Sequence, residues 1–256
     1  MENTTRRLPA KNALRCAFTG YRPAKMPFGY DEQSPLCLDF KKRLRETIEV
    51  LVLQGYLHMI SGGAQGMDMM AAEAVLDLKA QYPDLTLEIA IPYERQASKW
   101  PSEEQARWQR CIDAADMVTV ISHEYSKSCF FSRNRYMVEQ ADLLLACFDG
   151  KEGGTKMTVE YAHRVGCRVC LIPPVKQAMV TSSHQPTQTK HDMPWDDYDD
   201  DGGYDDDASL MGLSNFGKEP NLAERISDAG FQTLLGFECF FKGEMGREEN
   251  PCAITG

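Results

Sequence analysis

The sequence has no apolar run that approaches 18 residues, so it predicts no membrane-spanning helix. Its first residues, MENTTRRLPAKN, are polar and basic, and they show no apolar stretch of the kind found in secretory signals. Cys167-x-x-Cys170 has no second CxxC or Cys/His pair beside it, which favours core packing over a zinc or redox motif. The nine cysteines are an odd number, and together these features predict buried, reduced thiols and a cytoplasmic location.

Positive charge is also scarce. The formal net charge is −10, with 28 Lys and Arg against 38 Asp and Glu. Proteins that coat duplex nucleic acid need clustered Lys and Arg, so the composition argues against that class. Nine of the acids lie between Asp192 and Asp207, a stretch without Lys or Arg, so the remainder of the chain is close to neutral.

The apolar residues concentrate in the first 175 residues, where short strands alternate with helix-length segments. The pattern predicts strands at 14–20, 56–61, 85–93, 116–122, 142–148 and 167–174, with helices at about 38–55 and 67–79, one ending near 115, and two at 133–141 and 155–166. This alternation is typical of parallel strands joined by crossover helices. We therefore expect an α/β fold: a single Rossmann-like domain over 13–175, its mostly parallel sheet flanked by helices.

Outside that domain the composition changes. Residues 1–12 predict a flexible N-terminus, and 176–221 read as an acidic, low-complexity linker around WDDYDDDGGYDDD. Such a segment buries too little apolar surface to offset its backbone entropy, so we expect a disordered acidic C-terminal tail. Within 222–256, the stretch 222–241 has loosely helical spacing and could form a short amphipathic helix. The Asp-rich run lacks the spacing of a calcium loop, and the sequence predicts neither a metal nor a cofactor.

Several loops of interest each follow the carboxyl end of a predicted strand, the edge where open parallel sheets bind ligands. After the first strand come Thr19, Gly20, Tyr21 and Arg22. Glycine there lets the backbone approach a ligand, and the Arg22 guanidinium offers a bidentate fork for phosphate or carboxylate. A tight turn explains the same residues equally well.

The second loop, SGGAQGMD, contains Ser61, Gly62, Gly63, Gly66 and Asp68. Its three glycines can expose successive N–H groups to an anion, although the G-x-G-x-x-G spacing is absent. Asp68 falls in the first turn of the next helix. It either compensates the helix dipole locally or contacts a ribose or base.

The remaining candidates lie farther along the chain. Arg133 and Asn134 begin a predicted helix, and Gly153, Gly154 and Thr155 form another glycine loop before a helix. That loop is either an anion cradle or a tight turn with Thr155 as the N-cap, and two such loops on one sheet edge favour a ligand site. Tyr93 either stacks a nucleobase or covers the edge of the core.

In this order, FTGYRP, SGGAQGMD, RNRYMVEQAD and FDGKEGGT…TVEYA resemble the YpsA-type branch of the SLOG superfamily, over about residues 13–174. That superfamily also includes the DNA-processing protein DprA and the LOG-type phosphoribohydrolases. The resemblance implies a Rossmann-like sheet and recognition of a nucleotide or nucleotide-derived small molecule. By match to the family pattern, the pocket would be lined by Gly20, Arg22, Ser61, Gly62, Gly63, Gly66, Asp68, Arg133, Asn134, Gly153, Gly154 and Thr155.

The departures from that pattern separate three hypotheses. We first expect a binding or sensing module, because no clear nucleophile or acid/base pair is present. The alternative is a nucleotide N-glycoside hydrolase, with Arg133 holding phosphate and Glu160 as the catalytic carboxylate. LOG enzymes use P-G-G-x-G-T-x-x-E, whereas Glu160 lies five residues past Thr155 instead of three.

DprA-like binding of single-stranded DNA ranks lower, since the chain has no recognisable winged-helix tail and few stacking aromatics. By analogy alone, a homodimer is expected.

Overall fold

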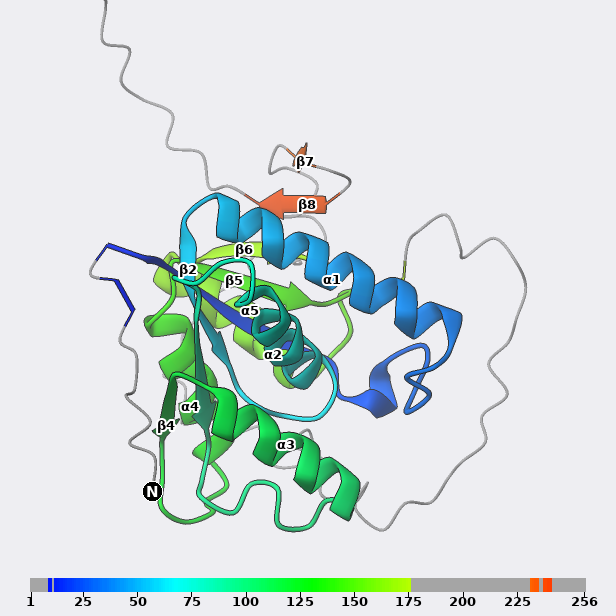
Figure 1. The fold of residues 1–256 in the computed structure, drawn as a ribbon, viewed down its shortest axis with the longest axis vertical. Coiled ribbons are helices and arrows are strands. Elements are labelled where there is room, and N and C mark those ends of the chain that lie inside the picture. The colour runs from blue at the N-terminus through cyan, green and yellow to red at the C-terminus, as the bar shows by residue number, and fades with distance from the viewer. Residues whose placement is uncertain (1–8, 11, 176–230, 235–236, 241–256) are drawn as a thin grey trace, which may run out of the picture.

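In the computed structural model of the chain, one sheet of eight strands forms the centre of the fold (Figure 1). The structure describes residues 9–10, 12–175, 231–234 and 237–240. The strand order is β4-β3-β2-β1-β5-β6-β8-β7. Strands β1 to β6 pair in parallel, as the alternation of elements predicts, and β8 and β7 add antiparallel neighbours at one edge. The strands span Leu14–Gly20 (β1), Tyr56–Ser61 (β2), Thr86–Ile91 (β3), Met117–Val120 (β4), Leu143–Cys147 (β5), Arg168–Leu171 (β6), Phe231–Leu234 (β7) and Phe237–Phe240 (β8).

The helices cover both faces of the sheet. They span Pro35–Leu53 (α1), Met67–Leu78 (α2), Ser102–Ala114 (α3), Cys129–Glu139 (α4) and Gly154–Val165 (α5), with a short 3-10 helix, η1, at Pro23–Lys25. Helix α2 packs between α1 and α3, and α4 packs against α5. These two helical layers enclose a parallel sheet, the Rossmann-like α/β architecture expected from the sequence.

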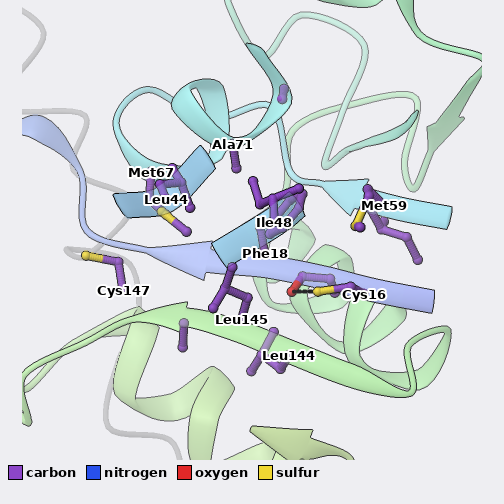
Figure 2. Close-up of a cluster of buried hydrophobic side chains, with 14 of the residues drawn as sticks. Cys16, Phe18, Leu44, Ile48, Met59, Met67, Ala71, Leu144, Leu145 and Cys147 are labelled. Atoms are coloured by element: carbon purple, nitrogen blue, oxygen red, sulfur yellow. Dashed lines mark hydrogen bonds between the residues drawn. The ribbon is translucent and has the colours of Figure 1, made fainter. Parts of the chain in front are cut away.

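The core lies where helices α1 and α2 meet strand β1. Leu44 and Ile48 of α1, with Met67 of α2, lie near Phe18 of β1 (Figure 2). The four-residue spacing of Leu44 and Ile48 puts both side chains on one face of α1, as expected for an amphipathic crossover helix. Helix α1 begins where the side chain of Ser34 accepts a hydrogen bond from the Cys37 N–H at 3.3 Å, a standard N-cap.

Three boundaries differ from the sequence-based expectation. Helix α4 begins at Cys129 rather than 133, because its apolar first turn packs on the domain. Strand β6 ends at Leu171, before Pro173 and Pro174, which have no N–H for a sheet ladder. Residues 231–234 and 237–240 form strands, within the stretch 222–241 that could have formed a short amphipathic helix. Phenylalanine and threonine favour strands, and glycines interrupt the helical pattern.

The predicted flexible N-terminus, except for residues 9, 10 and 12, lies outside the described residues, as do the acidic linker 176–221 and the rest of 222–256. None of the helices within the described part of the chain has the length and hydropathy that a bilayer span requires.

The order of the strands fixes where a ligand can bind. From β1 the chain builds outward through β2, β3 and β4, then α4 returns it to β5 on the other side of β1. The loops after β1 and β5 therefore diverge to opposite faces and leave a crevice between them. In open α/β sheets this reversal point, at the carboxyl ends of the strands, is the usual ligand site.

Candidate ligand-binding cleft

A cleft of about 530 Å³ opens at this reversal point. Four segments form its walls: the loop after β1, the loop between β2 and α2, helix α4, and the loop between β5 and α5. The lining residues are Thr19, Gly20, Tyr21, Arg22, Lys25, Ala64, Gln65, Asp68, Arg133, Asn134, Glu152, Gly153, Gly154 and Thr155. Polar and backbone atoms dominate this set, so the cleft is suited to a polar ligand.

The N-terminus of α5 faces the cleft. Gly153 is the N-cap, with φ 137°, and it has no side chain to cap the helix. The first helical hydrogen bond is donated by the Met157 N–H to the Gly153 carbonyl at 3.2 Å, so the amides of Gly154, Thr155 and Lys156 come before it. Such amides, together with the positive end of the helix dipole, form an anion site.

The glycine loop before α2 packs against the end of β1, and two of its amides bond within the protein. The Met67 N–H donates to the Tyr21 carbonyl at 3.2 Å, and the Gly63 N–H donates to the Ser61 hydroxyl at 3.2 Å. A Cβ on Gly66 would lie 2.5 Å from that same Tyr21 carbonyl oxygen, and Gly66 has φ +87°. The glycine is therefore required for the close contact between this loop and the end of β1.

Arg133 joins α4 to the same loop. Its side chain is 3% exposed, and Nη1 donates to the Gly62 carbonyl at 2.5 Å. The same nitrogen lies 3.6 Å from the Asp68 carboxylate, and Nε donates to the Asn134 amide oxygen at 2.8 Å. A Cβ on Gly62 would lie 1.8 Å from Nη1. The guanidinium thus organises the floor of the cleft, a different role from the catalytic phosphate contact that the hydrolase hypothesis gives it.

Asn134 continues this network from α4 to α5. Its amide nitrogen donates to the Thr158 hydroxyl at 3.1 Å, and that hydroxyl donates to the Gly154 carbonyl at 2.8 Å. Helix α4 is therefore tied through Thr158 to the first turn of α5. The position of the first α5 amides therefore depends on Asn134, which also accepts a hydrogen bond from Arg133.

A buried polar network beneath the cleft fixes α4 on the sheet. The Glu88 carboxylate accepts from the Thr119 hydroxyl at 2.6 Å and the Tyr136 hydroxyl at 2.7 Å, and it lies 2.9 Å from His58 Nε2. Burial pushes the Glu88 pKa upward, but the hydrogen bonds from His58, Thr119 and Tyr136 outweigh it, and the pKa lies below its ordinary value. Tyr136 is one helical turn beyond Arg133, so an ionised Glu88 anchors the helix that carries the cleft residues.

Tyr21 connects the ends of β1 and β5 across the crevice. Its hydroxyl donates to the Asp149 carboxylate and accepts from the Asp149 N–H at 3.3 Å. Burial, and then the hydrogen bond to Asp149, raise the Tyr21 pKa, so this phenol stays neutral at neutral pH. Tyr21 is suited to donate a hydrogen bond and to hold the loop, and unsuited to act as a base.

The charges on the cleft walls favour an anion. Arg22, Lys25 and Arg133 supply three cations, and Asp68 and Glu152 supply two carboxylates. Arg133 balances Asp68 at 3.6 Å, and Glu152 accepts a hydrogen bond from a lysine on α5. The lining therefore has one more cation than carboxylate, and this positive charge adds to the positive end of the α5 dipole.

Comparison with known proteins places this architecture in a family. The model of the YspA SLOG family (YpsA) matches residues 16–167, more than half of the 256-residue chain. The chain belongs to this family. A UPF0398 protein of Bacillus thuringiensis (strain Al Hakam) is 32% identical over 154 residues, which are 59% of this chain and 83% of the relative. A UPF0398 protein of Bacillus cereus (strain G9842) is 31% identical over the same shares.

Two solved structures are similar to this YpsA-family chain. One is DNA processing protein A (DprA) from Streptococcus pneumoniae, with a TM-score of 0.45 and 19% identity, covering 63% of this chain and 50% of that one. The other is DNA processing protein A from Helicobacter pylori, described for its single-stranded DNA binding mode. It has a TM-score of 0.43 and 18% identity, covering 62% of this chain and 65% of that one. The chain thus spans less than two thirds of either protein.

Ten of the predicted ligand-binding residues line the cleft of this YpsA-family protein: Thr19, Gly20, Tyr21, Arg22, Asp68, Arg133, Asn134, Gly153, Gly154 and Thr155. The lining does not include four predicted residues of the loop before α2, Ser61, Gly62, Gly63 and Gly66. These residues pack against neighbouring protein groups or bond to them instead. They shape the cleft without forming its surface.

Two predicted residues lie elsewhere. Tyr93 makes edge-on contacts with the rings of Tyr125 and Phe130, at centroid distances of 5.5 and 6.0 Å, beyond the ends of β3 and β4. The Glu160 carboxylate is 45% exposed on α5, 3.9 Å from Lys156, and it does not line the cleft. Five residues turn a helix through about 140° from Thr155, so Glu160 projects from a different face.

Sequence reasoning missed four lining residues, Lys25, Ala64, Gln65 and Glu152. Three of them belong to the two glycine loops already identified, and each is the neighbour of a predicted residue. Lys25 had a weaker signal, as a basic residue three positions after Arg22. Within the described residues, no group of three or more His, Cys, Asp or Glu side chains is placed to hold a metal ion.

Proposed function

We propose that this YpsA-family domain binds or senses a nucleotide or a nucleotide-derived, phosphate-bearing small molecule in the cleft between β1 and β5. The phosphate sits at the N-terminus of α5, against the amides of Gly154 and Thr155. Arg22 and Lys25 supply the opposing positive charge. Asp68 and Asn134 offer a carboxylate and an amide for the hydroxyl and N–H groups of the sugar or base.

One observation carries this proposal. The loop before α5 places Gly153, Gly154 and Thr155 in the cleft lining, and its helix begins at a glycine N-cap without a side-chain cap. The loop before α2 bonds to Tyr21 and Ser61 instead. The lining is more polar than is typical of small-molecule sites, which suits a charged ligand.

Binding without turnover is favoured by the positions of the ionisable groups. The hydrolase hypothesis needs a carboxylate in the cleft that is available to the sugar, and Glu160 lies outside it. Asp68 is in the cleft but lies 3.6 Å from Arg133. Tyr21 has a raised pKa, which disfavours a base role.

The test is a thermal-shift screen of the full chain against nucleoside mono- and diphosphates, dinucleotides, ADP-ribose and short single-stranded DNA. A ligand at about 100 times its Kd adds roughly 2.7 kcal/mol to the free energy of unfolding. We expect a small phosphorylated nucleoside to raise the melting temperature, and the matching unphosphorylated nucleoside to have a much smaller effect. A nucleoside as effective as its phosphate would overturn the anion site.

A variant sharpens this screen. Thr155→Glu places a carboxylate at the α5 N-terminus, where it interacts favourably with the helix dipole but occupies the anion site. We expect unchanged or slightly raised stability together with at least a tenfold loss of affinity, about 1.4 kcal/mol. Gln81→Glu is the matched control, because it adds the same charge at an exposed position before β3, at the opposite edge of the sheet. Equal effects of the two variants would show that only net charge matters.

DNA as the sole ligand would contradict the small-molecule proposal and support the single-strand alternative. That alternative predicts an affinity that falls steeply with salt, because each neutralised phosphate releases counterions.

A further inference from the structure

The loop between β1 and α1 forms one wall of the cleft, and its conformation is maintained from a distance. Residues 21–34 contain η1 followed by successive tight turns, with the Lys25 N–H bonded to the Arg22 carbonyl and the Gly29 N–H to the Met26 carbonyl, both at 3.0 Å. A loop of this length and compactness is typical of functional surface loops. Its ordering costs conformational entropy, which side-chain anchors must offset.

An apolar anchor and an ionic anchor hold this loop. Phe28 packs on Phe40 of α1, with ring centroids 6.0 Å apart. Glu32, close to the loop's end, accepts from Arg107 Nη1 at 2.6 Å and Nη2 at 3.2 Å, and it also accepts from Lys41 Nζ at 2.5 Å. The ionic anchor thus joins the loop to α3 and to α1.

Arg107 is the centre of this ionic anchor. On its other side it forms a second bidentate pair with Glu73 of α2, through Nε and Nη2, each at 2.6 Å. Its side chain is only 12% exposed, and a third carboxylate, Glu104, lies 3.6 Å away. Bidentate Arg–carboxylate pairs are among the stronger ion pairs, and the burial of Arg107 lessens their screening by salt.

The charges around Arg107 explain why this residue is critical. Without its guanidinium, Glu32 and Glu73 would face each other across a partly exposed site, with Lys41 as the cation still bonded to Glu32. With Arg107 in place, burial raises the pKa of Glu32, but the hydrogen bonds from Arg107 and Lys41 outweigh it, and its pKa lies below the ordinary value, so the native anchor pairs a charged carboxylate with the guanidinium. Repulsion between the carboxylates of Glu32 and Glu73 would then push the 21–34 loop away from α2.

We infer that Arg107 is a positioning residue, which holds the 21–34 loop closed against α2 and α3 and thereby sets Arg22 and Lys25 on the cleft wall. Arg107 does not line the cleft. It acts on the ligand through Glu32 and the turns of the loop. The link to affinity rests on the proposed function, whereas the link to loop order does not.

The first measurement is amide hydrogen exchange on the ligand-free full chain. In Arg107→Gln, we expect the turn amides of Lys25, Gly29, Asp31 and Ser34 to exchange on the order of tenfold faster, while the amides of β5 and β6 keep their wild-type rates. Glu32→Gln should loosen the same amides while leaving the Arg107–Glu73 pair intact. Unchanged exchange at these amides in both folded variants would overturn the inference.

The second measurement links the loop to the cleft, with AMP as the probe. Arg107→Gln should weaken AMP binding by about fivefold or more, and Arg107→Lys, which keeps the charge but not the paired fork, should recover part of the affinity. Arg45→Gln is the control, because it breaks a partly exposed pair with Glu49 on α1 that does not involve the loop, and it should change neither readout. A faster-exchanging loop with wild-type AMP affinity would refute the coupling. If wild-type protein binds no AMP, the proposed function fails for this probe, and hydrogen exchange alone decides the role of Arg107.

Discussion

Gly62→Ala is a direct test of the contact between Arg133 and the loop before α2. The new Cβ would lie 1.8 Å from Arg133 Nη1, whereas ordinary contacts begin near 3.4 Å. The guanidinium must therefore move by about 1.5 Å or more, which breaks its hydrogen bond to the Gly62 carbonyl. Losing a buried hydrogen bond made by a charged group costs roughly 1.5–3 kcal/mol.

The measurement is urea unfolding of the full chain in a double-mutant cycle with Arg133→Ala. In a thermal melt of a domain of this size, the same loss of unfolding free energy lowers the melting temperature by about 3–12 °C. When Arg133 is already alanine, the overlap with its guanidinium disappears and the 2.5 Å approach to Asp68 Oδ2 remains, so Gly62→Ala should cost clearly less than in the wild-type background. An equal cost in both backgrounds would refute the contact between Arg133 and this loop as the source of the destabilisation, because the strain would then arise elsewhere in the loop.

Two further predictions concern stability. The pKa of Glu88 is lower in the folded protein than its ordinary value of 4.5, so its stabilisation is present above that value and is lost as the pH falls through the folded pKa. Glu88→Gln should therefore flatten the acid limb of a plot of unfolding free energy against pH, and a limb identical to wild type would contradict the network. Phe18→Ala should cost about 3–5 kcal/mol in urea unfolding, because the ring is fully buried. The exposed Leu53→Ala should stay within about 0.5 kcal/mol of wild type, and similar costs for both would contradict the position of the core.

The main elements of the fold could be predicted because their signals are local. Strands β1 and β2 have the predicted bounds, and α2 differs by one residue at its end. Apolar runs and glycine stops carry that information within a few residues. The start of α4 could not be read in the same way, because the apolar CFFS turn becomes helical only when it packs on the domain. The β7–β8 hairpin likewise depends on pairing with β6, a contact distant in sequence.

The candidate site was likewise predicted only where its signals are local in the sequence. That two glycine loops share one sheet edge follows from strand order, and the sequence alone indicated it. That the Met67 N–H bonds inside the protein depends on Tyr21, whose carbonyl accepts it. The Arg107–Glu32 pair joins residues 75 positions apart, and no periodic pattern reports it. Long-range hydrogen bonds and ion pairs therefore had to come from the structure.

The bond between Tyr21 and Asp149 has a consequence for the synthesis of the protein, because it joins residues 128 positions apart. At typical elongation rates, Asp149 leaves the ribosome roughly 6–25 s after Tyr21. Until β5 inserts beside β1, the nascent chain has one wall of the cleft and no opposite wall. A ligand that needs both walls can stabilise only the finished domain. Its presence would shift the balance between folding and degradation for completed chains while leaving truncated ones exposed to proteases.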